Sequence, residues 1–273
     1  MILKKKYTLG VSLPVYNHEF CIKRVIQAIL DQDYEDIIIY IGDDCSSDNT
    51  FKIVTEYCSK FENIICYQNE QNLGVIDNCN KLIDFIDERN EIDLLCFIGG
   101  DDIMLPGKIS KQVSIFDSTG INYICHDYKV VDLINGKELG EKKHKNREVC
   151  NLRETICNGL PSITSMINFN KIGTLRHSST KSGTDLYLHW KYILSCGAET
   201  YYIPETLLIY GRTYNNVNAS NFDKEVKREK TLNLRKNNFM IIFKLFSEYP
   251  SYLFFKFTIN NFLYYIKGYF HKR

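Results

Sequence analysis

Short runs of apolar residues alternate with helically spaced apolar positions over the first 105 residues of the chain. Residues 8–13, 37–41, 64–67 and 94–98 form four such runs, and runs of this length predict buried strands. Between them, apolar side chains recur three and four residues apart, which predicts helices. The strand–helix order predicts an α/β fold with a mainly parallel sheet and helices on both of its faces.

The pattern is less regular between residues 106 and 222. It predicts a helix at 109–116, a strand at 123–131 and helical structure from 152 to 196 on both sides of the break at Gly159-Leu160-Pro161. Two short strands at 201–203 and 207–210 follow. The charged residues 142–145 predict a solvated loop.

Residues 223–273 differ in character and predict an amphipathic helical extension. Aromatic and aliphatic residues dominate from 239 to 270, but Lys244, Lys256 and Lys267 interrupt them, so no uninterrupted stretch is long enough to cross a bilayer. Aromatic residues mixed with basic ones fit a helix lying in a membrane interface. A helix pair packed on the preceding domain fits the same pattern, and both interpretations stay open.

Charge and cysteine usage exclude some classes of protein. The formal net charge of +1 argues against electrostatic binding of nucleic acid, so no nucleic-acid partner is expected. The ten cysteines include no CxxC pair, and no long apolar run follows the N-terminal lysines, so we expect free thiols in a cytoplasmic protein.

Polar residues follow each of the first four predicted strands, and parallel sheets bind ligands at the carboxyl ends of their strands. These residues are Tyr16, Asn17, Asp43, Asp44, Asn72, Gly74, and the run Gly99-Gly100-Asp101-Asp102. Two aspartate pairs at the ends of neighbouring strands would repel one another unless a cation joined them. Hard oxygen ligands of this kind suit Mg²⁺ or Mn²⁺, which also hold substrate phosphates. A helix cap or turn is the alternative role for each aspartate.

Six segments in order resemble the motifs of inverting family-2 glycosyltransferases with the GT-A fold, of the type that assembles bacterial surface polysaccharides. They are V-S-L-P-V-Y-N at 11–17, I-G-D-D-C-S-S-D-N-T at 41–50, N-L-G at 72–74, G-G-D-D at 99–102, G-T-D at 183–185 and Y-G-R-T-Y-N-N-V-N-A-S at 210–220. The resemblance covers roughly residues 7–220. It implies a GT-A catalytic domain at 1–222, with a nucleotide-binding half at 1–105 and an acceptor-binding half at 106–222.

The resemblance implies a role for each matched position. Pro14 and Tyr16 would line the base pocket, with Tyr16 stacking on the base, and Asp44 would accept from the base N3–H, which favours uracil. Asp101 would hold the Mn²⁺ or Mg²⁺ that bridges the diphosphate, and Asp185 would be the general base. The remaining residues expected to bind the nucleotide-sugar are Asn17, Asn72, Gly74, Gly100, Asp102 and Arg212.

The implied reaction moves a hexose or N-acetylhexosamine from a UDP-sugar to a saccharide acceptor linked to polyprenyl diphosphate. The displacement would be inverting, because one carboxylate on the acceptor side gives direct attack on an oxocarbenium-like centre. The expected setting is O-antigen or capsule synthesis, with the enzyme peripheral on the cytoplasmic face of the inner membrane.

Departures from the family pattern leave two alternatives. Gly99 stands where the family has the first Asp of D-x-D, so a contact to ribose or metal is absent or comes from Asp102. This departure keeps open a nucleotide-sugar-binding pseudoenzyme that serves as an assembly partner. A nucleotidyltransferase ranks lower, because Pro14-Val15-Tyr16 stands where that class has a glycine-rich, basic loop.

Overall fold

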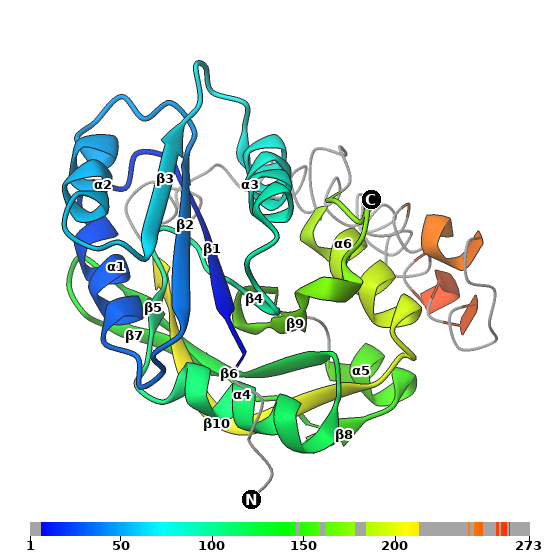
Figure 1. Cartoon of the computed structure of the whole chain (residues 1–273). Coiled ribbons are helices and arrows are strands. Elements are labelled where there is room, and N and C mark those ends of the chain that lie inside the picture. Colours follow the sequence, from blue (N-terminus) through cyan, green and yellow to red (C-terminus); the bar gives the residue numbers. More distant parts are fainter. Residues whose placement is uncertain are drawn as a thin grey trace, which may run out of the picture.

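The structure, a computed structural model of the whole chain, describes residues 7–145, 148–158, 162–177 and 184–212. It also describes short pieces of the C-terminal extension, at 240, 243–247, 255–256, 258–260 and 262. The side chains of residues 157 and 184–186 are outside this description. Figure 1 shows a central twisted sheet with helices packed on both sides.

The N-terminal half is the predicted parallel sheet. Its strands are β1 (Leu9–Val15), β2 (Ile37–Asp43), β3 (Ile64–Gln68) and β4 (Leu94–Phe97), in the spatial order β3-β2-β1-β4. The apolar run that ends at residue 13 placed Pro14 just after the first strand. In the structure Pro14 instead lies inside β1, opposite Gly42. β1 pairs with β4 only as far as Ser12, so the missing N–H of Pro14 disrupts no pairing on that side.

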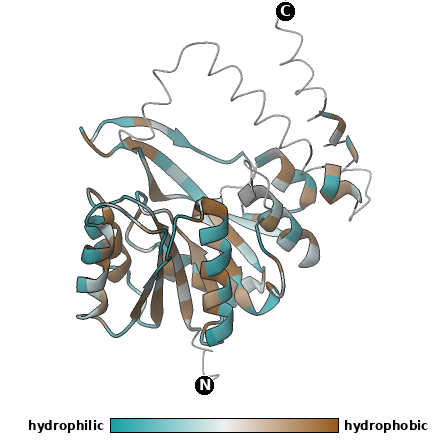
Figure 2. Cartoon of the chain, turned by 90° about the horizontal axis from the view of Figure 1, so that it is seen from above, coloured by the Kyte–Doolittle hydropathy of each residue, from teal (hydrophilic) through white to brown (hydrophobic). Residues whose placement is uncertain are grey.

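Helices cover the two faces of this sheet, and an apolar cluster lies between the sheet and the helices on each face. On one face lie α1 (Ile22–Leu30), α2 (Thr50–Cys58) and α4 (Lys108–Thr119), and on the other lie α3 (Val75–Arg89) and α6 (Thr184–Ser195). Figure 2 shows apolar strands between helices whose outer surfaces are largely hydrophilic. The α/β prediction with helices on both faces is confirmed.

The second half of the sheet is mixed, and the helical prediction for 152–196 is confirmed at 152–158 and 184–195 but is wrong at 166–168. A short strand, β9 (Met166–Asn168), lies antiparallel between β4 and β6 (Tyr123–Asp132). The 3₁₀ turns η1 (Ser162–Thr164) and η2 (Phe169–Lys171) flank it. Three residues are too few to produce a strand periodicity, so the apolar spacing around them resembled a helix.

The two strands predicted at 201–203 and 207–210 are one strand, β10 (Thr200–Arg212). Its pairing with β6 shifts register between Ile203 and Thr206, where Pro204 and Glu205 interrupt the ladder. The edge elements β5 (Ile103–Met104) and β8 (Glu148–Cys150) pair with β10, and α5 (Leu152–Asn158) follows β8.

The charged segment at 142–145 is only partly solvated. Lys143 is exposed, but His144 is 3% exposed, and its backbone N and its Nδ1 each lie 2.9 Å from Asp127 Oδ1. β7 (Glu138–Lys142) pairs with β6 and thereby carries His144 inward to Asp127. His144 does lie in a loop after β7, but the predicted solvation is wrong for it, because the pairing of β7 with β6 places it in the interior.

The described pieces of the extension lie beside α6 (Figure 1). Leu245 is fully buried against Tyr187 and Trp190 of α6, and the Lys244 ammonium lies 4.6 Å from the centre of the Tyr187 ring. A second set of side chains on these pieces is 40–52% exposed: Met240, Phe243, Phe255, Ile259 and Phe262. We call this set the tail apolar surface. Within the described part of the chain, no helix has the length and hydropathy needed to span a bilayer.

Candidate active site

Asp44 follows β2 and organises the turn before α3. It is 2% exposed, and its Oδ1 accepts hydrogen bonds from Leu73 N at 2.8 Å and Asn69 Nδ2 at 2.9 Å, while Oδ2 accepts from Gly74 N at 2.8 Å. Asn72 Nδ2 donates to the Asp44 carbonyl at 3.3 Å. Gly74 has φ 85°, a conformation that favours glycine. The predicted residues Asp44, Asn72 and Gly74 therefore form one hydrogen-bonded unit.

Asp43 has an equally complete set of partners. Its carboxylate accepts from Ser46 N at 2.9 Å, Ser46 Oγ at 2.6 Å and Gln68 Nε2 at 2.9 Å. The expectation that this pair and Asp101-Asp102 follow neighbouring strands is wrong. β2 and β4 are not neighbours, because β1 lies between them, and each carboxylate after β2 is stabilised by donors of its own.

Tyr16 and Asn17 form the loop after β1. Asn17 adopts φ 54°, its N donates to Ser46 Oγ at 2.9 Å, and its Oδ1 accepts from Ser47 N at 2.9 Å. These bonds fasten the β1 loop to the loop after β2. Tyr16 is left 44% exposed, so its ring is accessible to a ligand.

The loop after β4 carries the second aspartate pair. Asp102 is 1% exposed, with Oδ2 accepting from Gly99 N and Oδ1 from Gly211 N, both at 3.1 Å. Burial, followed by the negative charge of Asp101, raises the pKa of Asp102 to about 7. Asp101 is half-buried. Asp102 thus holds the loop to β10 from inside and leaves Asp101 as the more accessible carboxylate.

The end of β10 completes this side of the site. A Cβ on Gly211 would lie 1.8 Å from the Asp101 carbonyl oxygen, so the two backbones approach as closely as glycine allows. The Arg212 guanidinium lies 4.7 Å from the centre of the Tyr210 ring, and its charge lowers the pKa of Asp102, though less than burial raises it. The structure therefore brings Asp101, Asp102 and Arg212 together.

Two residues that the sequence did not single out support the other side of the same loop. A Cβ on Gly100 would lie 2.3 Å from His18 Nδ1, and Cys21 Sγ donates to the Gly100 carbonyl at 3.3 Å. Burial lowers the pKa of His18, and the charge of Asp101 opposes this shift. His18 directly follows the first motif, and that adjacency was the available signal.

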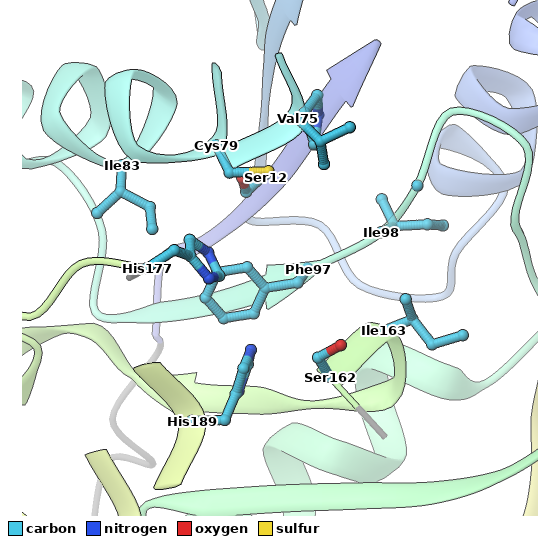
Figure 3. Close-up of a pocket in the computed structure, with 12 residues that line it drawn as sticks. Ser12, Val75, Cys79, Ile83, Phe97, Ile98, Ser162, Ile163, His177 and His189 are labelled. Carbon is cyan, nitrogen blue, oxygen red and sulfur yellow. The ribbon is translucent and has the colours of Figure 1, made fainter. Parts of the chain in front are cut away.

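A cavity of about 150 Å³ opens behind Pro14 and Gly99, at the carboxyl ends of β1 and β4 (Figure 3). Its α3 wall consists of Val75, Cys79 and Ile83. The rest of the lining consists of Ser12, Phe97, Ile98, Ser162, Ile163, His177 and His189. Pro14 lines this cavity and Tyr16 lies outside it, so the base pocket expected from these two residues together stays a prediction.

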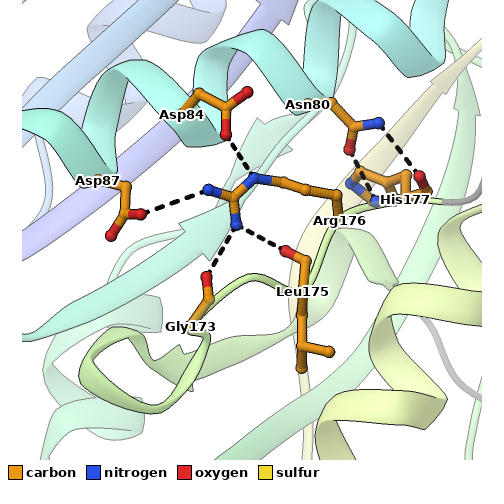
Figure 4. Close-up of polar contacts among 7 residues, drawn as sticks. All are labelled: Asn80, Asp84, Asp87, Gly173, Leu175, Arg176 and His177. Carbon is orange, nitrogen blue, oxygen red and sulfur yellow. Dashed lines mark hydrogen bonds and ion pairs between the residues drawn. The ribbon is translucent and has the colours of Figure 1, made fainter.

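The segment that carries His177 is fastened to α3 (Figure 4). Asn80 Oδ1 accepts from His177 N at 2.7 Å, and Asn80 Nδ2 donates to the His177 carbonyl at 3.1 Å. Arg176 Nε donates to Asp84 Oδ1 at 2.6 Å, and its Nη1 donates to the Leu175 carbonyl at 2.8 Å. One wall of the cavity therefore depends on contacts between α3 and residues almost a hundred positions later.

Residue 185 lies in the first turn of α6, the helix that also carries His189. The predicted catalytic role of Asp185 belongs to a side chain outside the described set, so it stays a prediction. The helix α6 packs on the same face of the sheet as α3.

Comparison with known families decides the identity of this α/β domain. The chain matches the family described as Glycosyl transferase family 2 over residues 11–181. This chain belongs to that family. It is a glycosyltransferase, as the motifs predicted, and the nucleotidyltransferase alternative is set aside.

Relatives of this glycosyltransferase include TuaG of Bacillus subtilis (strain 168), a glycosyltransferase named for teichuronic acid biosynthesis. The two are 27% identical over 233 residues, which span 82% of this chain and 86% of TuaG. WfgD of Escherichia coli, named as a UDP-Glc:alpha-D-GlcNAc-diphosphoundecaprenol beta-1,3-glucosyltransferase, is 27% identical over 139 residues, which are 50% of this chain and 53% of WfgD.

Solved structures confirm the GT-A-type fold of the glycosyltransferase. S. aureus TarS in complex with UDP-GlcNAc superposes with a TM-score of 0.66 at 17% identity, covering 96% of this chain and 81% of that one. Mannosyltransferase PcManGT from Pyrobaculum calidifontis, in complex with GDP-Man and Mn²⁺, superposes with a TM-score of 0.65 at 12% identity, covering 96% of this chain and 70% of that one.

The residues around Asp101 fit a divalent cation held by one carboxylate. Among the described side chains, no group of three or more His, Cys, Asp or Glu residues is arranged to bind a metal. Mg²⁺ and similar ions often take only one or two protein carboxylates and complete their shell with substrate phosphates and water. The repulsion that raises the pKa of Asp102 beside Asp101 is the kind that a cation relieves.

Proposed function

We propose that the chain transfers a hexose or N-acetylhexosamine from a UDP-sugar to a saccharide linked to polyprenyl diphosphate, in cell-surface polysaccharide synthesis. The observation that carries the proposal is the convergence of Asp101, Asp102 and Arg212 beside the open end of β1 and β4, in a chain of family 2. This arrangement offers one accessible carboxylate and one guanidinium to a diphosphate.

The nucleoside end of the donor lies toward β2 in this proposal. Tyr16 offers an exposed ring for stacking, and Asp44 offers its remaining acceptor site to the base N3–H, since a carboxylate has about four such sites and the chain uses three. The TarS structures named as complexes with UDP and UDP-GlcNAc support a uridine donor.

The diphosphate end lies over the loop after β4. Asp101 would hold Mn²⁺ or Mg²⁺, whose charge neutralises the negative charge that develops on the leaving diphosphate. Gly100 lets the backbone of this loop pack closely against the His18 ring, and Arg212 contributes a fixed positive charge. Asn17, Asn72 and Gly74 hold the facing loops in place.

The chemical step is direct displacement at the anomeric carbon. Asp185, at the start of α6, would accept the proton of the acceptor hydroxyl as that oxygen attacks, and the configuration inverts. The name of WfgD supports an acceptor on a polyprenyl diphosphate, and that of TuaG supports a surface-polysaccharide pathway.

The tail apolar surface is our candidate for contact with the membrane that holds such an acceptor, on its cytoplasmic face. Exposed Phe243, Phe255 and Phe262 suit the interfacial region of a bilayer. The double variant Phe255→Ser/Phe262→Ser should lower binding to vesicles that contain anionic lipid, while UDP affinity is unchanged. Unchanged sedimentation with vesicles would refute this part of the proposal.

The test of the donor is a thermal-shift screen against UDP, GDP, CMP and ADP, each with and without Mn²⁺. Ligand at about 100 times Kd adds ~2.7 kcal/mol to the free energy of unfolding, so UDP with Mn²⁺ should raise the melting temperature. Asp101→Ala should remove the Mn²⁺-dependent part of the shift. Asp185→Asn should keep the shift and lose turnover, and equal turnover in this variant would refute the assigned base. Binding without turnover in the unaltered chain would favour the pseudoenzyme alternative.

A further inference from the structure

The cavity between α3 and α6 contains a polar atom that the fold leaves without a partner. His189 is 2% exposed, its Nδ1 lies 3.0 Å from the Tyr123 hydroxyl, and its Nε2 has no hydrogen-bond partner. Figure 3 shows the His189 ring pointing from α6 toward Phe97, and the two rings meet edge to face with their centres 5.1 Å apart. A buried ring nitrogen without a partner costs about 1–3 kcal/mol, which a ligand atom in the cavity would offset.

The His189 ring is neutral, so its Nε2 offers one uncharged hydrogen bond. Burial, with the nearby His177 as a smaller cause, lowers the pKa of His189 to about 3. When the Tyr123 hydroxyl donates to Nδ1, the proton sits on Nε2. The cavity then presents a donor suited to a carbonyl oxygen rather than to a phosphate, for which a charged partner is stronger.

The position of His189 points to the sugar end of the donor. Residue 185 precedes it by four positions on α6, which is one helical turn, or about 6 Å along the axis. In the proposed reaction the base at 185 acts beside the anomeric carbon. The substituent on C2 is the group bonded to the neighbouring carbon, so it is the part of the sugar best placed to enter a cavity one turn away.

The lining selects among the possible C2 substituents. Phe97, Cys79, Ile83 and Ile163 give the cavity mainly apolar walls, and a hydroxyl placed among them would lose more hydrogen bonds to water than it regained. An acetamido group instead brings a methyl to the apolar walls and a carbonyl to His189 Nε2. The volume of about 150 Å³ is some ten times what one water needs, so a group of four heavy atoms fits.

We propose that this cavity is the pocket for the C2 acetamido group of an N-acetylhexosamine donor, and that His189 is the specificity-determining residue that binds the acetamido carbonyl. The inference rests on the proposed function, and it narrows the donor from any UDP-hexose to a UDP-N-acetylhexosamine. Discrimination against UDP-glucose then comes from the unfilled pocket and the unpaired Nε2.

The experiment measures dissociation constants of the full chain for UDP, UDP-GlcNAc and UDP-Glc by calorimetry in the presence of Mn²⁺. The unaltered chain should bind UDP-GlcNAc at least tenfold more tightly than UDP-Glc. His189→Leu should remove most of this preference, and His189→Gln, which keeps an amide N–H at a similar distance, should keep part of it. Neither variant should change the affinity for UDP.

Two further variants separate pocket effects from folding. Tyr123→Phe removes the hydroxyl beside His189 Nδ1 without altering the cavity wall, so the preference should fall less than in His189→Leu. Cys79→Leu fills the cavity from α3, so it should weaken the binding of UDP-GlcNAc and leave the affinities for UDP and UDP-Glc unchanged. This second change does not depend on whether His189 variants fold.

Each contrary result has a distinct meaning. Equal affinity of the unaltered chain for UDP-GlcNAc and UDP-Glc overturns the pocket assignment and leaves the proposed function intact. A loss of UDP affinity in His189→Leu and Cys79→Leu that equals the loss for UDP-GlcNAc overturns it too, because the cavity then holds the nucleoside. Absence of UDP binding in the unaltered chain overturns the proposed function itself.

Discussion

Replacing Gly211 by alanine should disrupt the site through backbone displacement alone. The added Cβ would stand 1.8 Å from the Asp101 carbonyl oxygen and 2.7 Å from Leu133 Cδ1. Carbon and oxygen atoms rest about 3.5 Å apart, so β10 and the Asp101 loop must separate by roughly 1.5 Å. The leucine side chain can rotate away, whereas the Asp101 backbone cannot move without moving its carboxylate.

The expected losses are large for a single methyl group. Forced overpacking costs about 1–3 kcal/mol of unfolding free energy. Lengthening the bond from Gly211 N to the buried Asp102 Oδ1 adds about 1–3 kcal/mol, because the acceptor has no access to water. Since a shift of about 1 Å at a reacting group lowers turnover about a hundredfold, Gly211→Ala should lose at least that much activity.

The assay pairs urea unfolding with the Mn²⁺-dependent affinity for UDP, and Gly10→Ala is the control. The Cβ added at Gly10 in β1 would meet Ile92 Cδ1 at 2.5 Å, and Leu95 Cδ1 and Ile92 Cγ2 at 3.3 and 3.4 Å, which are all side-chain atoms. Gly10→Ala should therefore cost less stability and leave UDP affinity unchanged. Wild-type affinity and stability in Gly211→Ala would show that the contact between β10 and the Asp101 loop does not position the site.

Three other perturbations test separate parts of the structure. Burial holds the pKa of His126 and of His189 below that of a histidine in the unfolded chain, so below pH 6.5 the unfolded state binds more protons than the folded state. The free energy of unfolding should therefore fall by about 1.4 kcal/mol per pH unit for each of these buried neutral histidines. Urea titrations between pH 5 and 7 measure this slope, which should be smaller in His126→Phe. Asn80→Ala removes both hydrogen bonds to His177, so it should lower the free energy of unfolding by about 1–3 kcal/mol and weaken the binding of UDP-GlcNAc. Calorimetry compares it with Asn135→Ala, a change at an exposed residue. Equal stability of the two variants would refute the role of Asn80. Leu245→Ala should lower the free energy of unfolding by about 2–5 kcal/mol through the lost contact with α6, and proteases should cleave the extension faster. Phe243→Ala, at a half-exposed residue, should not speed cleavage. Equal cleavage rates in the two variants would contradict the packing of Leu245 on α6.

The N-terminal half of the fold was predictable because its signals are local. Each of the four parallel strands is a short apolar run, and each intervening helix has a regular apolar spacing, so β1 to β4 and their helices appear at the expected places. β9 was missed because its three residues carry no period of their own and are fixed by pairing with β4 and β6. His144 was misjudged for a similar reason, since its burial follows from a strand pairing and from Asp127.

The site shows the same division between local and distant signals. Asp44 and the Asn72-Leu73-Gly74 turn belong to two motifs about 30 residues apart; the resemblance assigned both to the nucleotide-sugar, and hydrogen bonds join them in the structure. The sequence placed the two aspartate pairs on neighbouring strands, but the strand order, which inserts β1 between β2 and β4, depends on long-range pairing. His177 and His189 lie in none of the motifs, and they were missed because the cavity combines motif residues with scattered ones from α3, η1 and α6.

The bond between Asp102 and Gly211 has a consequence for how the protein is made. Its partners are 109 residues apart, and at about 5–20 residues per second a ribosome needs roughly 5–20 s to supply the second after the first. Both apolar clusters combine residues from the two halves of the chain, so the core is also incomplete in that interval. The loop that carries Asp101 and Asp102 lacks its bond to β10 until Gly211 is synthesised, so a nascent chain that stops before β10 has an incomplete site.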